Sequence, residues 1–338
     1  MKEDFRKPTS IDVARAAGVS QSAVSRVFTP GASVSKSTKE KVLQASAALG
    51  YKPNVLARAM ITGRSRIIGL VVAYLDNQFF PLALELLSNK LQQKGYHILI
   101  FTAPNTTEGV EGVVNDLMAY QVDGIITASV SMTSDLIEKL RVAGMPTVLF
   151  NRGQDKVSVS SVTSANFEGA RKATRFLLKG GHDRISHISG WQGSSTGRDR
   201  QSGFLMEMEK ADCTPFSVMD GMYDREEAMA CAENMLSGSS IPDAIFVGND
   251  HMAFGVIDVI RSKGLEPGRD VSVVGYDDVP MAAWDCYGLT TIRQPVNSMV
   301  DSTVSLILGM IETGDLAPER IEIDGPLVVR KSARTNEG

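Results

Sequence analysis

The chain has 338 residues, with 35 Lys and Arg against 39 Asp and Glu and a formal net charge of −4. This length exceeds one ordinary hydrophobic core, so we expect a small domain with a larger one, or two lobes. The three cysteines are scattered, which argues against a disulfide framework or a zinc site and fits a reducing compartment. No apolar run typical of a signal peptide opens the chain, and no uninterrupted stretch of about 18 apolar residues occurs. The sequence therefore predicts a soluble, cytoplasmic protein without a membrane partner.

Charge is distributed unevenly along the chain. Residues 1–66 contain 12 Lys and Arg and 4 Asp and Glu, whereas the remainder contains 23 and 35. A solvated charge run is the ordinary explanation, but these basic residues are interleaved with an apolar helical pattern. The asymmetry indicates that only the N-terminal part contacts a polyanion.

Two short helices separated by a tight turn are predicted for residues 9–27. Thr9 can cap the first helix, and Asp12 can return a bond to the cap. Gly18 allows the turn, and Ser20 can cap the second helix. Apolar residues recur at helical spacing and would close a small core between the helices: Val13, Ala14, Ala17, Val24 and Val27.

A polar stripe occupies the start of the second helix. Its members fall at positions i, i+1, i+4 and i+5: Gln21, Ser22, Ser25 and Arg26. This is the surface that a helix-turn-helix places in the major groove of DNA. The alternative is a generic helical hairpin with a solvated face, since short apolar periodicity with one glycine occurs in many helical proteins.

A third helix is predicted from a Ser35 or Ser37 cap to Leu49, so residues 1–53 would form one small domain. Its apolar stripe would comprise Val42, Leu43, Ala45 and Leu49. Residues 54–62 contain a cap residue and helix formers, but they are fewer than the roughly 12–15 residues at which an isolated helix becomes marginal in water. We expect this segment to be helical only when something holds it. With the short basic linker that follows, it spans residues 54–66.

From residue 67 onward, apolar runs alternate with amphipathic helices. The runs that we interpret as strands are residues 67–73, 97–103, 124–130, 147–151, 184–189, 216–219, 244–248 and 271–277. The predicted helices cover residues 80–94, 110–119, 134–143, 166–178, 198–210, 224–236 and 250–263. This alternation predicts an α/β fold of doubly wound parallel sheets in two lobes.

Polar or aromatic residues follow five of the predicted strands. They are residues 76–80, 151–152, 191–200, 248–250 and 276–278. In such folds ligands bind at the carboxyl ends of the strands, where two lobes can share one cleft. Any single one of these residues can equally be a helix cap or a satisfied turn. Their joint recurrence favours a polar cleft.

An enzyme is one alternative class, because Asp277 and Asp278 could be read as paired acids. The chain nevertheless lacks G-x-x-x-x-G-K-[ST], G-x-G-x-x-G after a strand and H-E-x-x-H, and its four histidines lack ligand spacing. We therefore predict no catalytic residue, no metal and no cofactor. A secreted sugar-binding protein is the other alternative, but it would need a signal peptide and has no use for a basic N-terminal domain.

Several motifs together resemble the LacI/GalR family of transcriptional regulators over nearly the whole chain. They are IDVARAAGVSQSAVSRV, VSKSTKEKVLQASAALGYKPNVLAR, RSRIIGLVV, VGNDHMAFGVIDVI, VSVVGYDD and LTTIRQP. The resemblance implies a repressor that binds a pseudo-palindromic DNA operator as a homodimer. It also implies an effector-binding and dimerisation core over residues 67–338, similar to periplasmic binding proteins. Its two lobes would be residues 67–163 with 296–324, and residues 164–293 with 325–332.

The resemblance also assigns DNA-binding positions. Gln21 and Ser22 match the positions that read base edges, and Arg26 matches an arginine suited to guanine O6 and N7. The other expected contacts in this domain are Thr9, Ser20 and Ser25. Residues 54–62 match the hinge helix, with expected contacts from Asn54, Ala57 and Met60. Met60 stands where the family usually has a leucine that wedges into the minor groove, and methionine is apolar and flexible enough to do so.

The same resemblance places an effector site in the core. The matching residues are Asn151, Arg200, Asn249, Asp277 and Gln294, with Phe79 and Tyr223 at aromatic positions and Arg152 and Arg198 as neighbours. A carboxylate opposite several amides and arginines suits vicinal hydroxyls, so we expect a carbohydrate or a derivative. Two or more arginines also permit a sugar acid or a sugar phosphate. The polar C-terminus KSARTNEG lacks a leucine heptad, which favours a dimer over a tetramer.

Overall fold

The computed structural model describes residues 6–29, 31–52, 64–73, 75–103, 107–130, 132–154 and 157–335. The chain divides into two compact units, Met1–Ser65 and Arg66–Gly338. Within the described ranges, no helix is long and apolar enough to cross a membrane.

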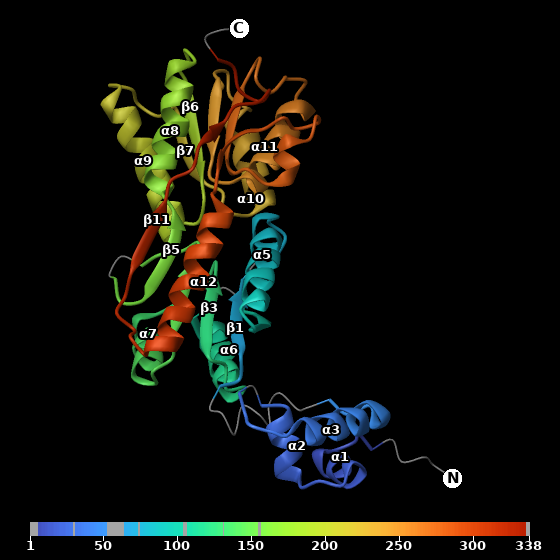
Figure 1. The fold of residues 1–338 in the computed structure, drawn as a ribbon. Helices are drawn as coiled ribbons and strands as arrows, with labels where there is room; N and C mark the ends of the chain where they lie inside the picture. Colours follow the sequence, from blue (N-terminus) through green and yellow to red (C-terminus); the bar gives the residue numbers. More distant parts are fainter. Residues whose placement is uncertain are drawn as a thin grey trace. The chain divides into compact units, whose positions relative to one another are not determined.

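In its described residues, the N-terminal unit has three helices (Figure 1): α1 (Ser10–Ala17), α2 (Gln21–Val27) and α3 (Lys36–Leu49). The predicted capping box is present, since the Thr9 amide donates to Asp12 Oδ2 over 2.9 Å and the Asp12 amide donates to Thr9 Oγ1 over 3.4 Å. Ser20 Oγ accepts the Ala23 amide and Ser35 Oγ accepts the Thr38 amide, each over 3.2 Å. The cap of the third helix is therefore Ser35. These caps satisfy amides that have no acceptor inside their own helix.

The core of this unit is very small. Its buried apolar residues are Val13, Ala14, Val24 and Val42, and around them pack Ala17, Val19, Val27, Phe28, Ala45 and Tyr51. The prediction for α3 was partly wrong, because Leu43 is 44% exposed and Leu49 is 40% exposed. Each residue advances an α-helix by about 100°, so the residue after Val42 leaves the buried face.

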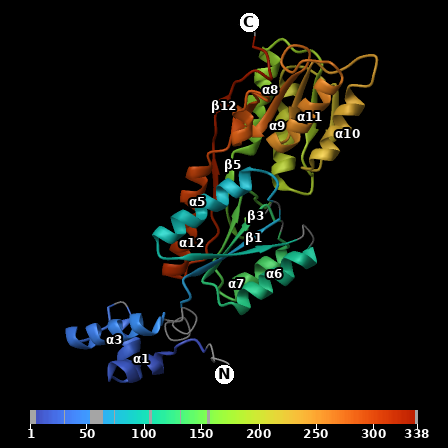
Figure 2. The ribbon, with the colours of Figure 1, turned by 90° about the vertical axis from the view of Figure 1, so that its right-hand side faces the viewer.

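The described part of the C-terminal unit contains two six-stranded sheets. The first has the order β11-β5-β4-β3-β1-β2, and every strand pair in it is parallel. Its strands are β1 (Ile67–Val72), β2 (His97–Thr102), β3 (Gly124–Ala128), β4 (Thr147–Phe150), β5 (Ser160–Ser164) and β11 (Arg320–Ile323). Helices α5 (Phe79–Gln93) and α12 (Val296–Thr313) cover one face, and α6 (Thr107–Ala119) and α7 (Ser134–Val142) cover the other (Figure 2).

The second sheet has the order β12-β10-β9-β8-β6-β7, parallel except for the β10–β12 pair. Its strands are β6 (Ile185–Ser189), β7 (Ser217–Asp220), β8 (Ala244–Val247), β9 (Ser272–Asp277), β10 (Thr290–Arg293) and β12 (Leu327–Val328). Helices α8 (Asn166–Lys179) and α9 (Ser195–Lys210) lie on one face, and α10 (Arg225–Met235) and α11 (Asp250–Ser262) lie on the other (Figure 1). A short 3₁₀-helix covers Pro280–Ala283.

The chain passes between the two sheets three times, after β5, after β10 and after β11. The predicted α/β fold with parallel sheets is confirmed. Strands β5, β10, β11 and β12 and helix α12 are additional to the predicted elements. Strand β5 (SSVTS) has a single apolar residue, yet all five of its residues are buried. Neighbouring strands and helices bury this polar segment. Because the segment contains no apolar run, its own sequence does not predict a strand.

Candidate functional site

The predicted polar stripe lies on the surface of α2. Gln21, Ser22, Ser25 and Arg26 are all exposed, whereas Val24 on the opposite side is buried. Gln21 Nε2 donates to Ser10 Oγ over 3.0 Å, and Arg26 Nε donates weakly to the Ser22 carbonyl over 3.4 Å. A guanidinium has five N–H donors, so Arg26 retains most of its hydrogen-bonding capacity for another molecule.

The two remaining predicted contacts of this unit are helix caps. Thr9 begins α1 and Ser20 begins α2, so both lie beside the positive ends of helix dipoles. Helix N-termini of this kind are good partners for phosphate groups. The hinge predictions for Asn54, Ala57 and Met60 lie outside the described residues.

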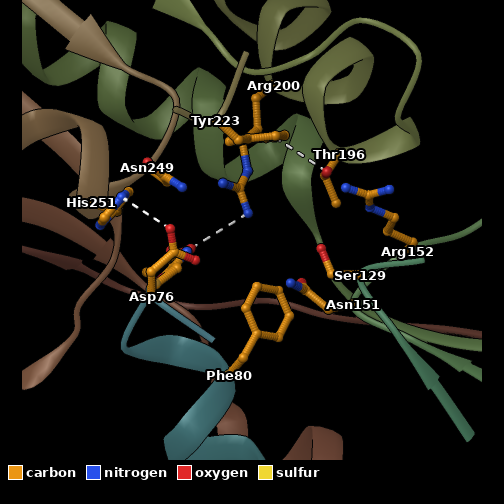
Figure 3. A pocket seen from close by; sticks show the side chains of 12 residues that line it. Asp76, Phe80, Ser129, Asn151, Arg152, Thr196, Arg200, Tyr223, Asn249 and His251 are labelled. Carbon is orange, nitrogen blue, oxygen red and sulfur yellow. Dashed lines mark hydrogen bonds and ion pairs between the residues drawn. The ribbon is translucent and has the colours of Figure 1, made fainter. Parts of the chain in front are cut away.

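A buried polar pocket lies in the C-terminal unit between the carboxyl ends of the two sheets (Figure 3). It encloses about 460 Å³ of space, counting the part that opens to solvent. Twelve residues line it: Asp76, Asn77, Phe80, Ser129, Asn151, Arg152, Thr196, Arg200, Tyr223, Asn249, His251 and Asp277. Because the strands are parallel, the residues that follow β1, β3 and β4 meet those that follow β6 to β9.

Four of the lining residues have a strained backbone. Ser129, Asn151, Tyr223 and Asp277 have φ values of 62°, 64°, 59° and 130°. Non-glycine residues rarely adopt positive φ, because the Cβ then approaches the backbone. Such strain persists where the surrounding structure enforces it, and it is concentrated at functional sites.

A buried guanidinium forms the centre of the pocket wall. Arg200 is 2% exposed and lies 3.6 Å over the ring of Tyr276. Its Nε donates to Asn166 Oδ1 over 2.9 Å, and its Nη1 donates to the Gly248 carbonyl over 2.6 Å. Its Nη2 lies 3.6 Å from Asp277 Oδ1. These contacts fix Arg200 in one orientation, so a ligand meets donors that are already positioned.

The carboxylate of Asp277 faces Arg200 from the end of β9. Gln294 Nε2 donates to its Oδ1 over 2.7 Å, and Asn77 Nδ2 donates to its Oδ2 over 3.2 Å. Burial raises the pKa of Asp277, while the charge of Arg200 and these two hydrogen bonds oppose that rise. The Asn77 bond joins the two lobes of the unit, and so does the bond from the Gly153 amide to Ser195 Oγ, 3.0 Å long.

A second acid, Asp250, supports this wall from behind. Thr291 Oγ1 donates to its Oδ1 over 2.6 Å, and the Val279 amide donates to its Oδ2 over 3.0 Å. A Cβ at position 275 would lie 2.3 Å from Asp250 Oδ1, so Gly275 is needed for this close approach. Burial and the neighbouring charge of Asp277 raise the pKa of Asp250 to about 8.

The side-chain amides of two asparagines that line the pocket differ in their hydrogen bonds. Asn249 caps α11, because its Oδ1 accepts the Met252 amide over 2.9 Å. Asn151 is 7% exposed, and its Oδ1 is buried without a hydrogen-bond partner in the described part of the chain. A buried polar atom without a partner costs free energy, so a ligand that brought a donor to this oxygen would recover that cost.

The structure brings six of the nine predicted effector-site residues into the pocket: Asn151, Arg152, Arg200, Tyr223, Asn249 and Asp277. Gln294 lies behind Asp277 and holds it. Phe79 is in the hydrophobic core, stacked on Phe150 at a centroid distance of 6.2 Å, and the next residue, Phe80, lines the pocket in its place. Arg198 donates to the Gln192 carbonyl over 3.2 Å and is not among the lining residues.

The six other lining residues were not predicted as site residues. Asp76, Asn77 and Phe80 fall within a strand end that the sequence singled out, and so does Thr196. His251 follows Asn249 at the start of α11, and its Nε2 lies 3.9 Å from Asp76 Oδ2. Ser129 lay inside the strand predicted for residues 124–130, so no signal marked it as a site residue. Within the described residues, no group of three or more His, Cys, Asp or Glu side chains could hold a metal ion.

A helix-turn-helix unit and a two-sheet core with a polar pocket define a class of proteins, the DNA-binding transcriptional regulators with a ligand-binding core. Residues 11–54 match the family of bacterial regulatory proteins, lacI family, and residues 174–333 match the periplasmic binding protein-like domain. The repressor PurR of Pasteurella multocida (strain Pm70) is 30% identical over 327 residues, which cover 96% of this chain and 98% of that protein. PurR of Haemophilus influenzae (strain PittEE) is 30% identical over 330 residues, with the same coverage of both chains.

The chain therefore belongs to the LacI family and is a DNA-binding transcriptional repressor. Solved structures agree with this assignment. The lac repressor dimer bound to operator and the anti-inducer ONPF has a TM-score of 0.88 at 26% identity, covering 97% of this chain and 99% of that one. A complex of the transcriptional regulator CelR with cellobiose has a TM-score of 0.73 at 29% identity, covering 96% and 99%. These relatives are transcription regulators, not enzymes.

Proposed function

We propose that this repressor binds a pseudo-palindromic operator as a homodimer in the cytoplasm, and that a carbohydrate or a carbohydrate derivative controls it from the core pocket. The observation that carries the proposal is the pocket wall formed by Arg200, Asp277 and Asn151. It presents fixed donors beside fixed acceptors, and one of those acceptors, Asn151 Oδ1, is buried without a partner among the described residues. Vicinal hydroxyls donate and accept at neighbouring positions and so match such a wall.

The DNA-binding side of the proposal rests on α2. Arg26 would read a guanine, Gln21, Ser22 and Ser25 would contact neighbouring base edges or phosphates, and the N-termini capped by Thr9 and Ser20 would hold the DNA backbone. Residues Asn54, Ala57 and Met60 would contact the minor groove at the centre of the operator. The lac repressor structure, a dimer on its operator, supports this arrangement.

Exposed apolar side chains support the dimer. In the single chain, the C-terminal unit exposes several large apolar side chains, among them Leu75, Ile100, Met222 and Trp284. Ile100 lies on β2, an edge strand of the first sheet. Exposed apolar surface beyond scattered single residues marks interfaces between proteins.

Coupling between pocket and DNA would follow from the two lobes. The bonds from Asn77 to Asp277 and from Gly153 to Ser195 hold the lobes in one arrangement across the pocket. A ligand that replaces or reinforces these bonds changes the relative free energies of two lobe arrangements. It then changes DNA affinity by no more than its difference in affinity for the two states.

The experiment combines three measurements on the full chain. Selection from random DNA should give an inverted repeat, sedimentation should give a dimer, and a sugar or sugar derivative found by thermal shift should change operator affinity. Asp277→Asn should abolish the thermal shift while operator binding without the ligand persists. Selected DNA without two-fold symmetry would contradict the dimer. A ligand whose thermal shift survives in Asp277→Asn would place the effector site elsewhere.

A further inference from the structure

The pocket is electrostatically asymmetric along its length (Figure 3). Asp76 and His251 lie toward one end, with 3.9 Å between Asp76 Oδ2 and His251 Nε2. Asp277 also lines the pocket and accepts a hydrogen bond from Asn77, the residue after Asp76. Arg152 and Thr196 lie at the opposite end. The carboxylate of Asp277 is paired with Arg200 and that of Asp76 with His251, whereas the opposite, basic end adds a second guanidinium, that of Arg152.

The basic end is built from two elements that are held together. Arg152, 4% exposed, lies 5.6 Å from the Trp191 ring. The amide of the next residue, Gly153, donates to Ser195 Oγ in the first turn of α9. The loop after β4 and the start of α9 therefore lie against each other, and both reach the pocket.

The start of α9 adds N–H donors to this end. Ser194 Oγ accepts the Gly197 amide over 3.1 Å, but the amides of Ser195 and Thr196 precede the first acceptor inside the helix. The 16-residue helix also directs the positive end of its dipole here. A guanidinium beside a helix N-terminus is a combination that binds carboxylates and phosphates.

A second observation concerns Asn151, which lies immediately before Arg152 and lines the pocket. Its Oδ1 is buried and has no hydrogen-bond partner among the described residues. That oxygen needs a donor, and a carboxylate has none. A ligand that carries an anionic group for Arg152 and O–H donors for Asn151 and Asp277 would satisfy both ends of the pocket.

We propose that the effector is a sugar acid, bound with its carboxylate against Arg152 and the first turn of α9 and its hydroxyls toward Asn151 and Asp277. This inference rests on the proposed function, because it takes the pocket to be the effector site. Asp76 and Asp277 repel an anion, so they fix the orientation of the ligand as well as binding its hydroxyls. The planar carboxylate matches the fork of a guanidinium, which favours an acid over a neutral sugar of the same shape.

The test compares matched ligands by calorimetry on the full chain. The pairs are D-gluconate with D-glucitol, D-glucuronate with D-glucose, and D-galacturonate with D-galactose, with D-glucose 6-phosphate as the phosphate probe. We expect at least one acid to bind about tenfold or more tightly than its neutral partner, since a hydrogen bond to a charged group contributes that much. Added salt should weaken the acid and leave the neutral partner nearly unaffected.

Arg152→Met should reduce the ratio of acid to neutral affinity by about tenfold, and Arg152→Lys should reduce it less, because lysine keeps the charge but not the fork. Arg269→Met is the control: it removes the same charge from an exposed ion pair with Glu266 and Asp270, outside the pocket lining, and should preserve the ratio. The salt dependence of the wild-type chain decides the matter if Arg152→Met fails to fold.

The outcomes separate this inference from the proposed function. A neutral sugar that binds as well as its acid and releases or strengthens operator binding overturns the sugar-acid assignment and leaves the proposed function standing. Binding of the phosphate probe without any acid overturns the carboxylate in favour of a phosphate. If no probe of either kind binds, both the inference and the carbohydrate effector fail.

Discussion

The helix-turn-helix unit exposes its candidate contact residues, whereas the core buries its own. Gln21, Ser22, Ser25 and Arg26 are exposed and lie within two turns of one helix. In the core, Arg200 is 2% exposed, and the Asn77–Asp277 hydrogen bond joins residues 200 positions apart. A surface that reads DNA can be made by one short helix, but a pocket that encloses a small molecule needs strand ends from the whole unit.

The two units also differ in what stabilises them. Among its described residues, the N-terminal unit has four buried apolar side chains, so capped helix ends contribute a large share of its stability. The core has extensive apolar clusters on both faces of its sheets. The free energy gained from this apolar burial offsets the cost of the strained backbones and buried charges in the pocket of the C-terminal unit. The predictions below test this contrast.

The largest effect is expected from a charge placed in the smaller unit. Val42→Asp would bury an unpaired carboxylate among Val13, Ala14 and Val24, at a cost that so small a core cannot offset. Specific DNA binding should be lost, while the thermal unfolding of the core stays unchanged. Leu43→Asp, at the exposed neighbouring position, is the control and should keep both. A Val42→Asp chain that still binds operator would show that the N-terminal unit has a larger stability reserve than its core indicates.

The second largest loss of stability is expected at the buried pair of Arg200 and Asp277 in the C-terminal unit. Arg200→Met leaves the Asp277 carboxylate buried without its cation, and removing one partner of a buried pair costs about 3–5 kcal/mol. Chemical denaturation of the core should show this loss, and effector binding should disappear with it. Arg269→Met removes a guanidinium from an exposed pair with Glu266 and Asp270 and should change stability little. If both variants lost the same free energy of unfolding, burial of the ion pair would not determine the cost of removing its arginine.

A third prediction concerns acid stability. His187 is buried between the rings of Phe204 and Phe246, and burial lowers its pKa to about 4. The unfolded chain binds this proton near pH 6.5 and the folded chain only near pH 4, so stability declines as the pH falls between these values. The loss reaches about 3 kcal/mol below pH 4. His187→Phe should remove that slope, whereas His97→Phe, on the exposed edge strand, should keep it. The free energy of unfolding measured from pH 8 to pH 4 gives both slopes.

The smallest effect belongs to the exposed surface of α2. Arg26→Ala should weaken specific operator binding by about 1–3 kcal/mol, because one bidentate contact to a base is lost. Nonspecific DNA binding and thermal stability should remain nearly unchanged, because Arg26 is exposed. Equal losses of specific and nonspecific affinity would make Arg26 a phosphate contact instead.

The sequence by itself determined the features that depend on neighbouring residues. Helical periodicity and capping residues were sufficient to predict α1 to α3 and the polar stripe of α2, since Thr9 and Asp12 or Ser20 and Ala23 are three residues apart. Apolar runs followed by polar residues predicted most strands and the edge of the sheets at which a pocket forms. Six of the nine effector-site predictions fell in that pocket.

Only the tertiary structure decided the rest, because it depends on segments that are distant in sequence. Adjacent residues at the start of a helix differ in direction by about 100°, so only packing against Phe150 decides that Phe79 is in the core and Phe80 lines the pocket. Asn77 meets Asp277, and Asp250 holds Thr291, because the strand order brings their ends together. Strand β5 is buried by its neighbours, not by its own hydrophobicity. Local sequence patterns do not show which distant segments pair, because the free energy that selects these contacts comes from burial in the assembled sheets.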